Sequence, residues 1–190
     1  MTTRPVLLLT GAPGVGKSTI IQRVIAQLPE RPGGFFTREV RRNGVRVGFE
    51  IVTLDGETAL LATTDAHATF PNQRRLGRFI VNAEAVAQVA VPAMERAAER
   101  GALVIVDEIG PMEIFSERFC DAVRNLLDDD HCAVFGTIVA RPHRFADDVK
   151  KHPRVRLVAV TRENRDELPA QLRPLFRFGA ARRDEDYASS

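Results

Sequence analysis

The feature that most constrains this chain is a glycine-rich motif near its amino end. Residues 11–18 read GAPGVGKS and match the pattern G-x-x-x-x-G-K-[ST]. An apolar run at residues 6–9 precedes the motif, and an amphipathic run at residues 20–28 follows it. This order predicts a strand, a tight turn and a helix, which is the context in which the pattern builds a phosphate-binding loop.

Each part of the motif has a chemical reason. Gly11, Gly14 and Gly16 let the backbone turn tightly, so that its N–H groups approach phosphate oxygens without obstruction by side chains. The Lys17 ammonium can reach the β- and γ-phosphates, and the Ser18 hydroxyl can ligate Mg²⁺. We therefore expect a nucleoside triphosphate to bind here. The predicted contacts in this loop are Gly11, Ala12, Pro13, Gly14, Val15, Gly16, Lys17, Ser18 and Thr19.

Composition limits the remaining possibilities. The 190 residues suffice for one α/β domain with a substantial core and are too few for two. A formal net charge of +2 is too small to predict binding to nucleic acid or membranes. The two cysteines form no C-x-x-C pair. No apolar run approaches the ~20 residues of a membrane span. The first residues run directly into the predicted strand, so we expect no signal peptide. We expect a cytoplasmic, monomeric protein without a nucleic-acid partner.

An antiparallel insertion is predicted after the first helix. The dipeptide Asn43-Gly44 lies between two stretches of alternating polarity, and a type I′ hairpin turn needs positive φ at both residues. A second dipeptide, Asp-Gly at 55–56, predicts a turn into a strand at 57–62. Residues 63–77 are polar and irregular and indicate a surface loop, and residues 78–81 indicate a short strand.

The rest of the chain reads as alternating helices and buried strands. Asn82 can cap a helix over 83–100, which Pro92 should kink or divide. Ser116 can cap the next helix, which should end at an acidic run. The further predicted strands are 102–106, 132–137 and 155–160, and the further helices are 146–151 and 165–176. We predict a domain over 1–176 and a flexible tail over 177–190.

A second motif is the apolar run LVIVDE at residues 103–108, which ends in two acids. A carboxylate such as Asp107, at the carboxyl end of a buried strand beside a phosphate-binding loop, can hold Mg²⁺ directly or through water. Glu108 is then the predicted base that orients the attacking water. Glu113 is a second candidate for this base and ranks below Glu108. The alternative for both acids of the motif is a merely polar strand end.

Two further strand ends carry polar candidates. Thr137 follows an apolar strand and is a candidate catalytic residue with Lys17, Asp107 and Glu108, although a structural role in the turn is equally consistent with the sequence. Arg162 and Asn164 follow the last strand, where ligands of open α/β sheets bind, and can contact base or phosphate. Helix capping is the alternative for that segment. Among the hairpin arginines, Arg38 is the candidate for a lid over the triphosphate, and the alternative is a solvated edge.

Together these segments resemble the cancer-related nucleoside-triphosphatase family, which has human, thermophilic bacterial and archaeal members. The similarity runs over GAPGVGKS at 11–18, GFFTREVR at 34–41, DEIGPME at 107–113, FGTI at 135–138 and TRENR at 161–165. The DEIGPME string beside the hairpin sequence is far more specific than the phosphate-binding loop alone. The resemblance spans most of the chain up to about residue 176.

The resemblance implies a RecA-like P-loop NTPase fold: an α/β/α sandwich of three layers, with a mostly parallel sheet and an antiparallel hairpin addition. It also implies Mg²⁺-dependent hydrolysis of ATP, GTP and other nucleoside triphosphates to diphosphate and phosphate, with broad base specificity. By the same resemblance, the loop at 11–18 and a segment at 103–110 bind the nucleotide. The second segment comprises Leu103, Val104, Ile105, Val106, Asp107, Glu108, Ile109 and Gly110.

Two other functions remain compatible with the sequence. A nucleotide or small-molecule kinase would need an acceptor pocket and an arginine-bearing lid, which residues 38–78 can in principle supply. A nucleotide-dependent switch acting on a nucleic acid or protein would use the same loop, but the weak net charge gives it little support.

Overall fold

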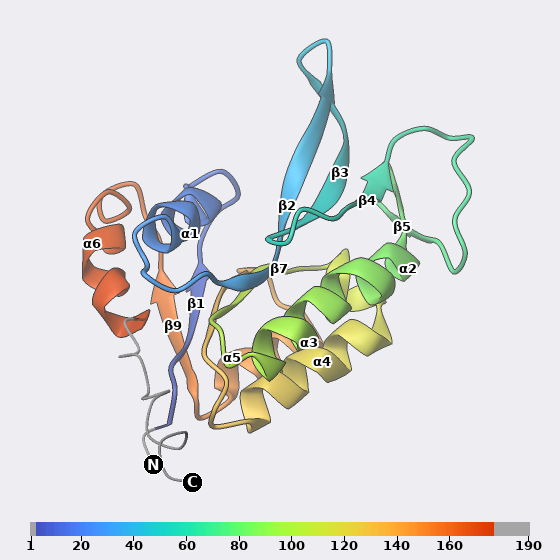
Figure 1. Ribbon diagram of the computed structural model, residues 1–190. Helices are drawn as coiled ribbons and strands as arrows, with labels where there is room; N and C mark the ends of the chain where they lie inside the picture. Colours follow the sequence, from blue (N-terminus) through green and yellow to red (C-terminus); the bar gives the residue numbers. More distant parts are fainter. Residues whose placement is uncertain (1–2, 177–190) are drawn as a thin grey trace, which may run out of the picture.

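Five parallel strands form the half of the sheet that carries the glycine-rich loop (Figure 1). The computed structural model describes residues 3–176. The parallel strands, in spatial order, are β2 (Gly33–Arg42), β7 (Val104–Ile109), β8 (Val134–Ile138), β1 (Val6–Thr10) and β9 (Val155–Ala159). Because they run the same way, their carboxyl ends meet at one edge of the sheet, where ligands of such sheets bind.

The other half of the sheet is antiparallel and continues the order outward from β2 as β3, β4, β6 and β5. β2 belongs to both halves, because residues 33–36 pair with β7 and residues 35–42 pair with β3. The predicted hairpin turn is confirmed: Asn43 and Gly44 have φ values of 51° and 77°. The added strands are β3 (Val45–Thr53), β4 (Thr58–Thr63), β5 (Arg74–Leu76) and β6 (Phe79–Val81).

Helices cover both faces of the sheet (Figure 1). On one face, α1 and α6 pack on a core that contains Leu7, Ile105 and Phe135. On the other face, α3, α4 and α5 pack on a core that contains Val106 and Phe119. The helices are α1 (Lys17–Ile25), α2 (Ala83–Ala85), α3 (Val91–Glu99), α4 (Glu117–Asp128), α5 (Arg144–Lys151) and α6 (Leu168–Leu172), with a π-helical turn at Val86–Ala90 and 3₁₀ turns at Glu113–Phe115 and Arg173–Phe176.

The predicted helix caps are present. The Asn82 side chain accepts a hydrogen bond from the backbone N–H of Ala85, and the Ser116 hydroxyl accepts one from Phe119. Each side chain satisfies an N–H group that the first turn of a helix leaves without an intrahelical partner. Pro92 lies in the first turn of α3, directly after the π-helical turn, so the helical stretch is divided there as expected.

Three sequence predictions need correction. Residues 74–76, predicted as loop, form β5, because the short β6 offers an edge with which they pair. The predicted buried strand at 155–160 is the edge strand β9, and Arg156 and Leu157 are exposed on it because β1 is its neighbour on one side alone. The predicted helix over 165–176 is α-helical from Leu168, since turns precede it. The predicted tail at 177–190 lies outside the described residues.

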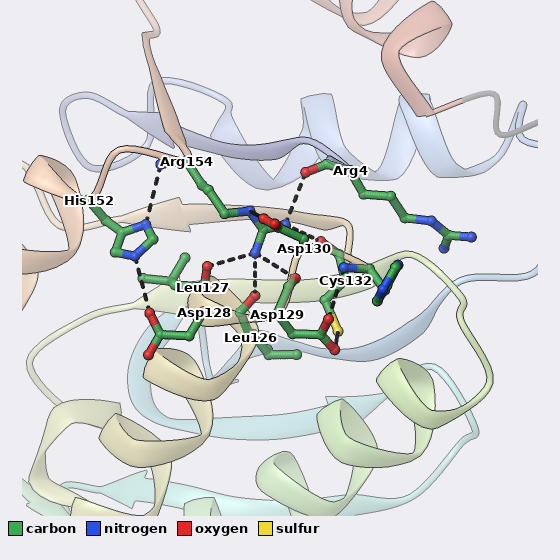
Figure 2. A network of polar contacts seen from close by, with 10 residues as sticks. Arg4, Leu126, Leu127, Asp128, Asp129, Asp130, Cys132, His152 and Arg154 are labelled. Atoms are coloured by element: carbon green, nitrogen blue, oxygen red, sulfur yellow. Dashed lines mark hydrogen bonds and ion pairs between the residues drawn. The ribbon is translucent and has the colours of Figure 1, made fainter. Parts of the chain in front are cut away.

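One arginine organises the amino ends of the parallel strands. Arg154, directly before β9, donates hydrogen bonds to five backbone carbonyls, and Figure 2 shows them gathered around its guanidinium. They belong to the end of α4 and to the residues before β1 and β8, namely Leu126, Leu127, Asp129, Arg4 and Cys132. The network therefore fixes one end of the sheet by polar contacts that are all internal to the chain.

Within residues 3–176, no helix combines the length and apolar character that crossing a bilayer would require.

Candidate functional site

The glycine-rich loop follows β1 and leads directly into α1. Gly11 lies so close to the next strand that a Cβ there would be 2.6 Å from the carbonyl oxygen of Val160. Gly16 precedes α1 with φ 112° and ψ 16°, a left-handed conformation that favours glycine. The first turn of α1 has neither an acidic residue nor a side-chain cap, so its N–H groups are available to an anion.

Lys17 lies across this loop. Its Nζ donates to the carbonyl oxygens of Gly11, at 3.1 Å, and Ala12, at 3.4 Å. Both acceptors belong to the loop itself, so the ammonium is held among the N–H groups that would surround a polyphosphate. Ala12, Pro13 and Gly14 are exposed at the tip of the loop. Val15 is buried against the α1 side of the core and anchors the loop from beneath.

The structure brings Asp107, near the end of β7, to the start of α1. The carboxylate is buried and accepts hydrogen bonds from the hydroxyls of Thr137, at 2.6 Å, and Ser18. Burial raises the pKa of Asp107, while the two hydroxyls and the Lys17 charge oppose that shift. The glycine-rich loop and the acidic end of β7, about ninety residues apart in the sequence, are thus joined by the contact between Ser18 and Asp107.

The contact between Ser18 and Asp107 suits a magnesium ion. A hydroxyl and a carboxylate oxygen are ligands that Mg²⁺ accepts, and it usually takes the rest of its shell from phosphate and water. Among residues 3–176, no group of three or more His, Cys, Asp or Glu side chains is placed to hold a metal by itself. The residues present therefore fit a metal bound together with a triphosphate better than a metal bound by protein alone.

Thr137 contacts Asp107 from the buried interior of the sheet. The threonine is fully buried in β8 and its hydroxyl donates to Asp107 Oδ1. The hydroxyl proton is thus used to orient the carboxylate, and the catalytic role of Thr137 stays a prediction. The alternative role, a structural one, agrees with this placement.

Two further carboxylates converge on Gly110, just after β7. A Cβ built on Gly110 would lie 3.0 Å from Oε2 of Glu108 and 2.9 Å from Oε2 of Glu113. Burial raises the pKa of Glu108, and the nearby Lys17 ammonium opposes this shift. Burial together with the negative charge of Glu108 raises the pKa of Glu113 to about 8. Glu113 therefore holds its proton at neutral pH, which favours Glu108 as the base.

The apolar part of the segment at 103–110 contributes to the core. Leu103 and Ile105 pack on the α1 side, whereas Val104, Val106 and Ile109 pack on the α3 and α4 side. All five side chains are buried, so the expected contact of this segment with a nucleotide, which stays a prediction, does not involve them. Their role is to hold β7 between the layers and thereby place Asp107 and Glu108 at the edge of the sheet.

The loop after β9 agrees with one of its two predicted roles. Asn164 Oδ1 accepts the backbone N–H of Thr161 at 2.9 Å, and its Nδ2 donates to the Ala159 carbonyl at 2.9 Å. Both ends of the amide are thus used within the loop, which favours the capping role over recognition of a base edge. Arg162 is exposed to solvent.

Sequence reasoning passed over Arg165, which reaches the glycine-rich loop. Its Nη1 donates to the carbonyl oxygen of Val15 at 3.4 Å, and its Cδ lies 3.6 Å from the Cβ position of Gly16. Arg165 and Asp166 face α1 across a cavity of about 170 Å³. The signal was present in the TRENR string, but sequence alone does not show which of its arginines turns toward the loop.

Three comparisons with known proteins agree with this geometry. The model of a protein family described as NTPase matches residues 6–173. The nucleoside-triphosphatase THEP1 of Thermotoga maritima is 36% identical over 172 residues, which cover 90% of this chain and 95% of that protein. The cancer-related nucleoside-triphosphatase homolog of Mus musculus is 37% identical over 174 residues, which cover 85% of this chain and 91% of that protein.

A solved structure shows the same similarity. The crystal structure of THEP1 from the hyperthermophile Aquifex aeolicus matches with a TM-score of 0.79 at 33% sequence identity, covering 90% of this chain and 98% of that one.

Proposed function

The chain belongs to the nucleoside-triphosphatase family, and from that premise we propose an Mg²⁺-dependent enzyme that hydrolyses ATP, GTP and other nucleoside triphosphates to diphosphate and phosphate, with broad base specificity. Hydrolysis of nucleoside triphosphates and the α/β P-loop fold follow from the family and its structures, as the resemblance implied. The metal, the breadth of specificity and the residue roles are our proposal. The observation that supports them best is the contact of Ser18 with Asp107 beside Lys17.

Binding is assigned to the loop and the start of α1. The N–H groups of residues 11–18 surround the phosphates, and Lys17 compensates charge on the β- and γ-phosphoryl groups. Ser18 and Asp107 would hold Mg²⁺, which supplies charge neutralisation at the phosphate oxygens. Thr137 keeps the Asp107 carboxylate in position through its 2.6 Å hydrogen bond.

Glu108 is proposed to orient the attacking water. Its carboxylate lies near Lys17 and beside Asp107, at the end of β7. A base needs an ionised carboxylate within about 2.6–3.2 Å of the water, and the Lys17 charge favours that ionised form. Glu113, with a pKa of about 8, keeps its proton at neutral pH and is not assigned as the base.

Broad base specificity is supported by the loop after β9. The Asn164 amide, a candidate for reading a base edge, is already bonded to Thr161 and Ala159. Arg165 presents a flat guanidinium, which packs on the face of any base or sugar without distinguishing them.

We also propose a cytoplasmic monomer without a nucleic-acid partner. The proposed site draws its groups from one chain, so it needs no second subunit. Cys120 and Cys132 are both buried free thiols, which suits a reducing compartment. The net charge of +2 gives no electrostatic reason for nucleic-acid binding.

The proposal is tested by phosphate release from a nucleotide panel, with and without Mg²⁺, for the parent and Glu108→Gln. We expect release that depends on Mg²⁺ and varies little with the base, and a loss of about 10²–10⁴-fold in Glu108→Gln with nucleotide affinity retained, because the amide cannot take a proton. Glu30→Gln, an exposed change in the loop after α1, is the control. Parental turnover in Glu108→Gln would remove that residue as the base, and phosphate transfer only with an added acceptor would indicate a kinase.

A further inference from the structure

We infer that Arg38, on the β2–β3 hairpin, binds the γ-phosphate of the bound triphosphate and stabilises charge as that group is transferred, while Glu50 holds the guanidinium in place. This inference rests on the proposed function, because it places a second cation at the same phosphate site. It extends the site from the parallel strands onto the antiparallel addition.

Strand register places Arg38 on the correct face of the sheet. Phe36 of β2 lies opposite Asp107 of β7 in the parallel ladder. Because side chains alternate between faces along a strand, Arg38 projects from the same face as Phe36 and Asp107. The Cα atoms of Arg38 and Asp107 are then separated by roughly 8 Å, from two residues of strand rise and one strand spacing.

The hairpin extends toward the nucleotide side of the sheet. Arg38 lies two residues beyond Phe36, the last residue that pairs with β7, so it stands level with the end of β7 at the carboxyl edge of the parallel strands. Figure 1 shows the hairpin rising from this edge, on the same side as the loop that joins β1 to α1. The Arg38 side chain therefore leaves the sheet on the same face as the Asp107 side chain, and its guanidinium is held by Glu50 of β3.

A neighbouring acid fixes the guanidinium without enclosing it. Nε and Nη2 of Arg38 donate to Oε2 of Glu50 at 3.2 and 2.7 Å, across the paired strands β2 and β3. The Arg38 side chain is 59% exposed, so its head remains open to a ligand. A guanidinium has five N–H donors, and these contacts leave donors for phosphate oxygens.

The charges around the site favour a further cation such as Arg38. Asp107 and Glu108 lie beside Lys17, so a triphosphate adds its negative charge to a site where two carboxyl groups share one ammonium. A preorganised cation that touches the transferring phosphoryl oxygens lowers the energy of the transition state more than that of the bound substrate.

Three other arginines near the site are engaged elsewhere. Arg41 and Arg46 both bind Glu39, and Glu39 projects from the face opposite to Arg38 because it is the next residue of the strand. Arg165 donates to the carbonyl of Val15, at the base of the loop. Arg42 shares the face of Arg38 but lies four residues farther along β2, next to the hairpin turn, so Arg38 is the hairpin arginine whose face, position and exposure agree with contact to the γ-phosphate.

Arg38 and Arg41 make a matched pair for the test. Both are exposed arginines of β2, both form an ion pair with a glutamate of the hairpin, and they differ in the face from which they project. The variants Arg38→Ala and Arg41→Ala are compared for three affinities and for kcat and KM. The affinities are those for ADP, for the β,γ-imido analogue of ATP, and for ADP with aluminium fluoride as a mimic of the transferring phosphoryl group.

We expect Arg38→Ala to lower kcat by about 10²–10³-fold and to weaken binding of ADP with aluminium fluoride similarly, since one preorganised donor is removed. Affinity for ADP should stay within about twofold, because ADP lacks the phosphate that Arg38 contacts. Glu50→Gln should lower kcat by a smaller factor. Arg41→Ala should leave every quantity near its parental value, and guanidinium ions added to Arg38→Ala should restore part of the lost rate.

Two results would overturn the inference: a parental kcat and parental analogue affinities in Arg38→Ala, or an equal loss of affinity for ADP and for both analogues. A parent that hydrolyses no nucleotide would contradict the proposed function instead. The comparison of ADP with the imido analogue would still decide whether Arg38 contacts a γ-phosphate, since it needs no turnover.

Discussion

The two ends of the parallel strands are both rich in polar groups, yet they use them in opposite ways. At the amino end, the Arg154 side chain is 11% exposed and its hydrogen bonds go to five backbone carbonyls (Figure 2). At the carboxyl end, Lys17 contacts two carbonyls of its own loop, and the N–H groups at the start of α1 have no side-chain cap. One end is satisfied within the chain, and the other is arranged around groups that a ligand can satisfy.

The pKa values of the carboxylates also differ between the two ends of the parallel strands. A hydrogen bond from the Cys132 thiol lowers the pKa of Asp129, next to Arg154, and the backbone N–H of His131 adds to the shift. Burial raises the pKa of Asp107, Glu108 and Glu113 at the other end. A carboxylate whose ionised form is stabilised by partners adds to the stability of the fold. A buried carboxylate with too few partners lowers that stability, and such groups are typical of functional sites.

The largest difference between the ends should appear on removal of Lys17. We expect Lys17→Ala to reduce hydrolysis by about 10³-fold or more, because the ammonium that compensates phosphoryl charge is lost. The free energy of unfolding without nucleotide should change by less than about 0.5 kcal/mol, since partly exposed lysine contacts contribute little. Phosphate release and chemical denaturation measure the two effects, and normal turnover would remove the assignment of the loop.

Removal of Arg154 should give the reverse result. We expect Arg154→Ala to lower the free energy of unfolding by about 3 kcal/mol, because backbone carbonyls of three segments lose their donor. Thermal denaturation should show a decrease in Tm of roughly 6–12 °C. Activity per folded molecule should persist at a temperature where the variant remains folded. Arg156→Ala, at an exposed position of β9 two residues later, is the control, and equal stability losses in both variants would contradict the assigned network.

The sequence predicted those parts of the molecule that local spacing determines. The loop at 11–18, the acids at the end of β7, the turn at Asn43-Gly44 and the caps by Asn82 and Ser116 all depend on residues within a few positions of one another. Each pattern has one conformation that satisfies its backbone, so the pattern identifies the structure. The parallel core could be inferred as well, since apolar runs alternate with helices.

Contacts between remote segments could not be predicted in this way. Arg154 bonds to the carbonyl of Arg4, 150 positions earlier, and no local pattern marks it among the many arginines of the chain. Thr137 was placed at a strand end correctly, but which neighbour its hydroxyl meets depends on the register of β7 and β8. The face that Arg38 shares with Asp107 likewise follows from the pairing of β2 with β7. Register between distant strands is a tertiary property.

An effect confined to the carboxyl end is the pH dependence that Glu113 adds to stability. Its pKa of about 8 in the folded chain exceeds the ordinary value of 4.5. Between these values the folded state holds a proton that the unfolded state has released. The free energy of unfolding should therefore fall as the pH rises through this window, by at most about 1.4 kcal/mol per pH unit, and level off above pH 8.

Glu113→Gln isolates this contribution, because glutamine cannot ionise while Asp107 and Glu108 remain in place. The variant should match the parent near pH 5 and exceed its stability near pH 8, measured by chemical denaturation without nucleotide or metal. Glu117→Gln, an exposed change at the start of α4, should follow the parental pH profile. Parallel profiles for the parent and Glu113→Gln across the window would mean that Glu113 is ionised in the fold, and would return it to consideration as the base.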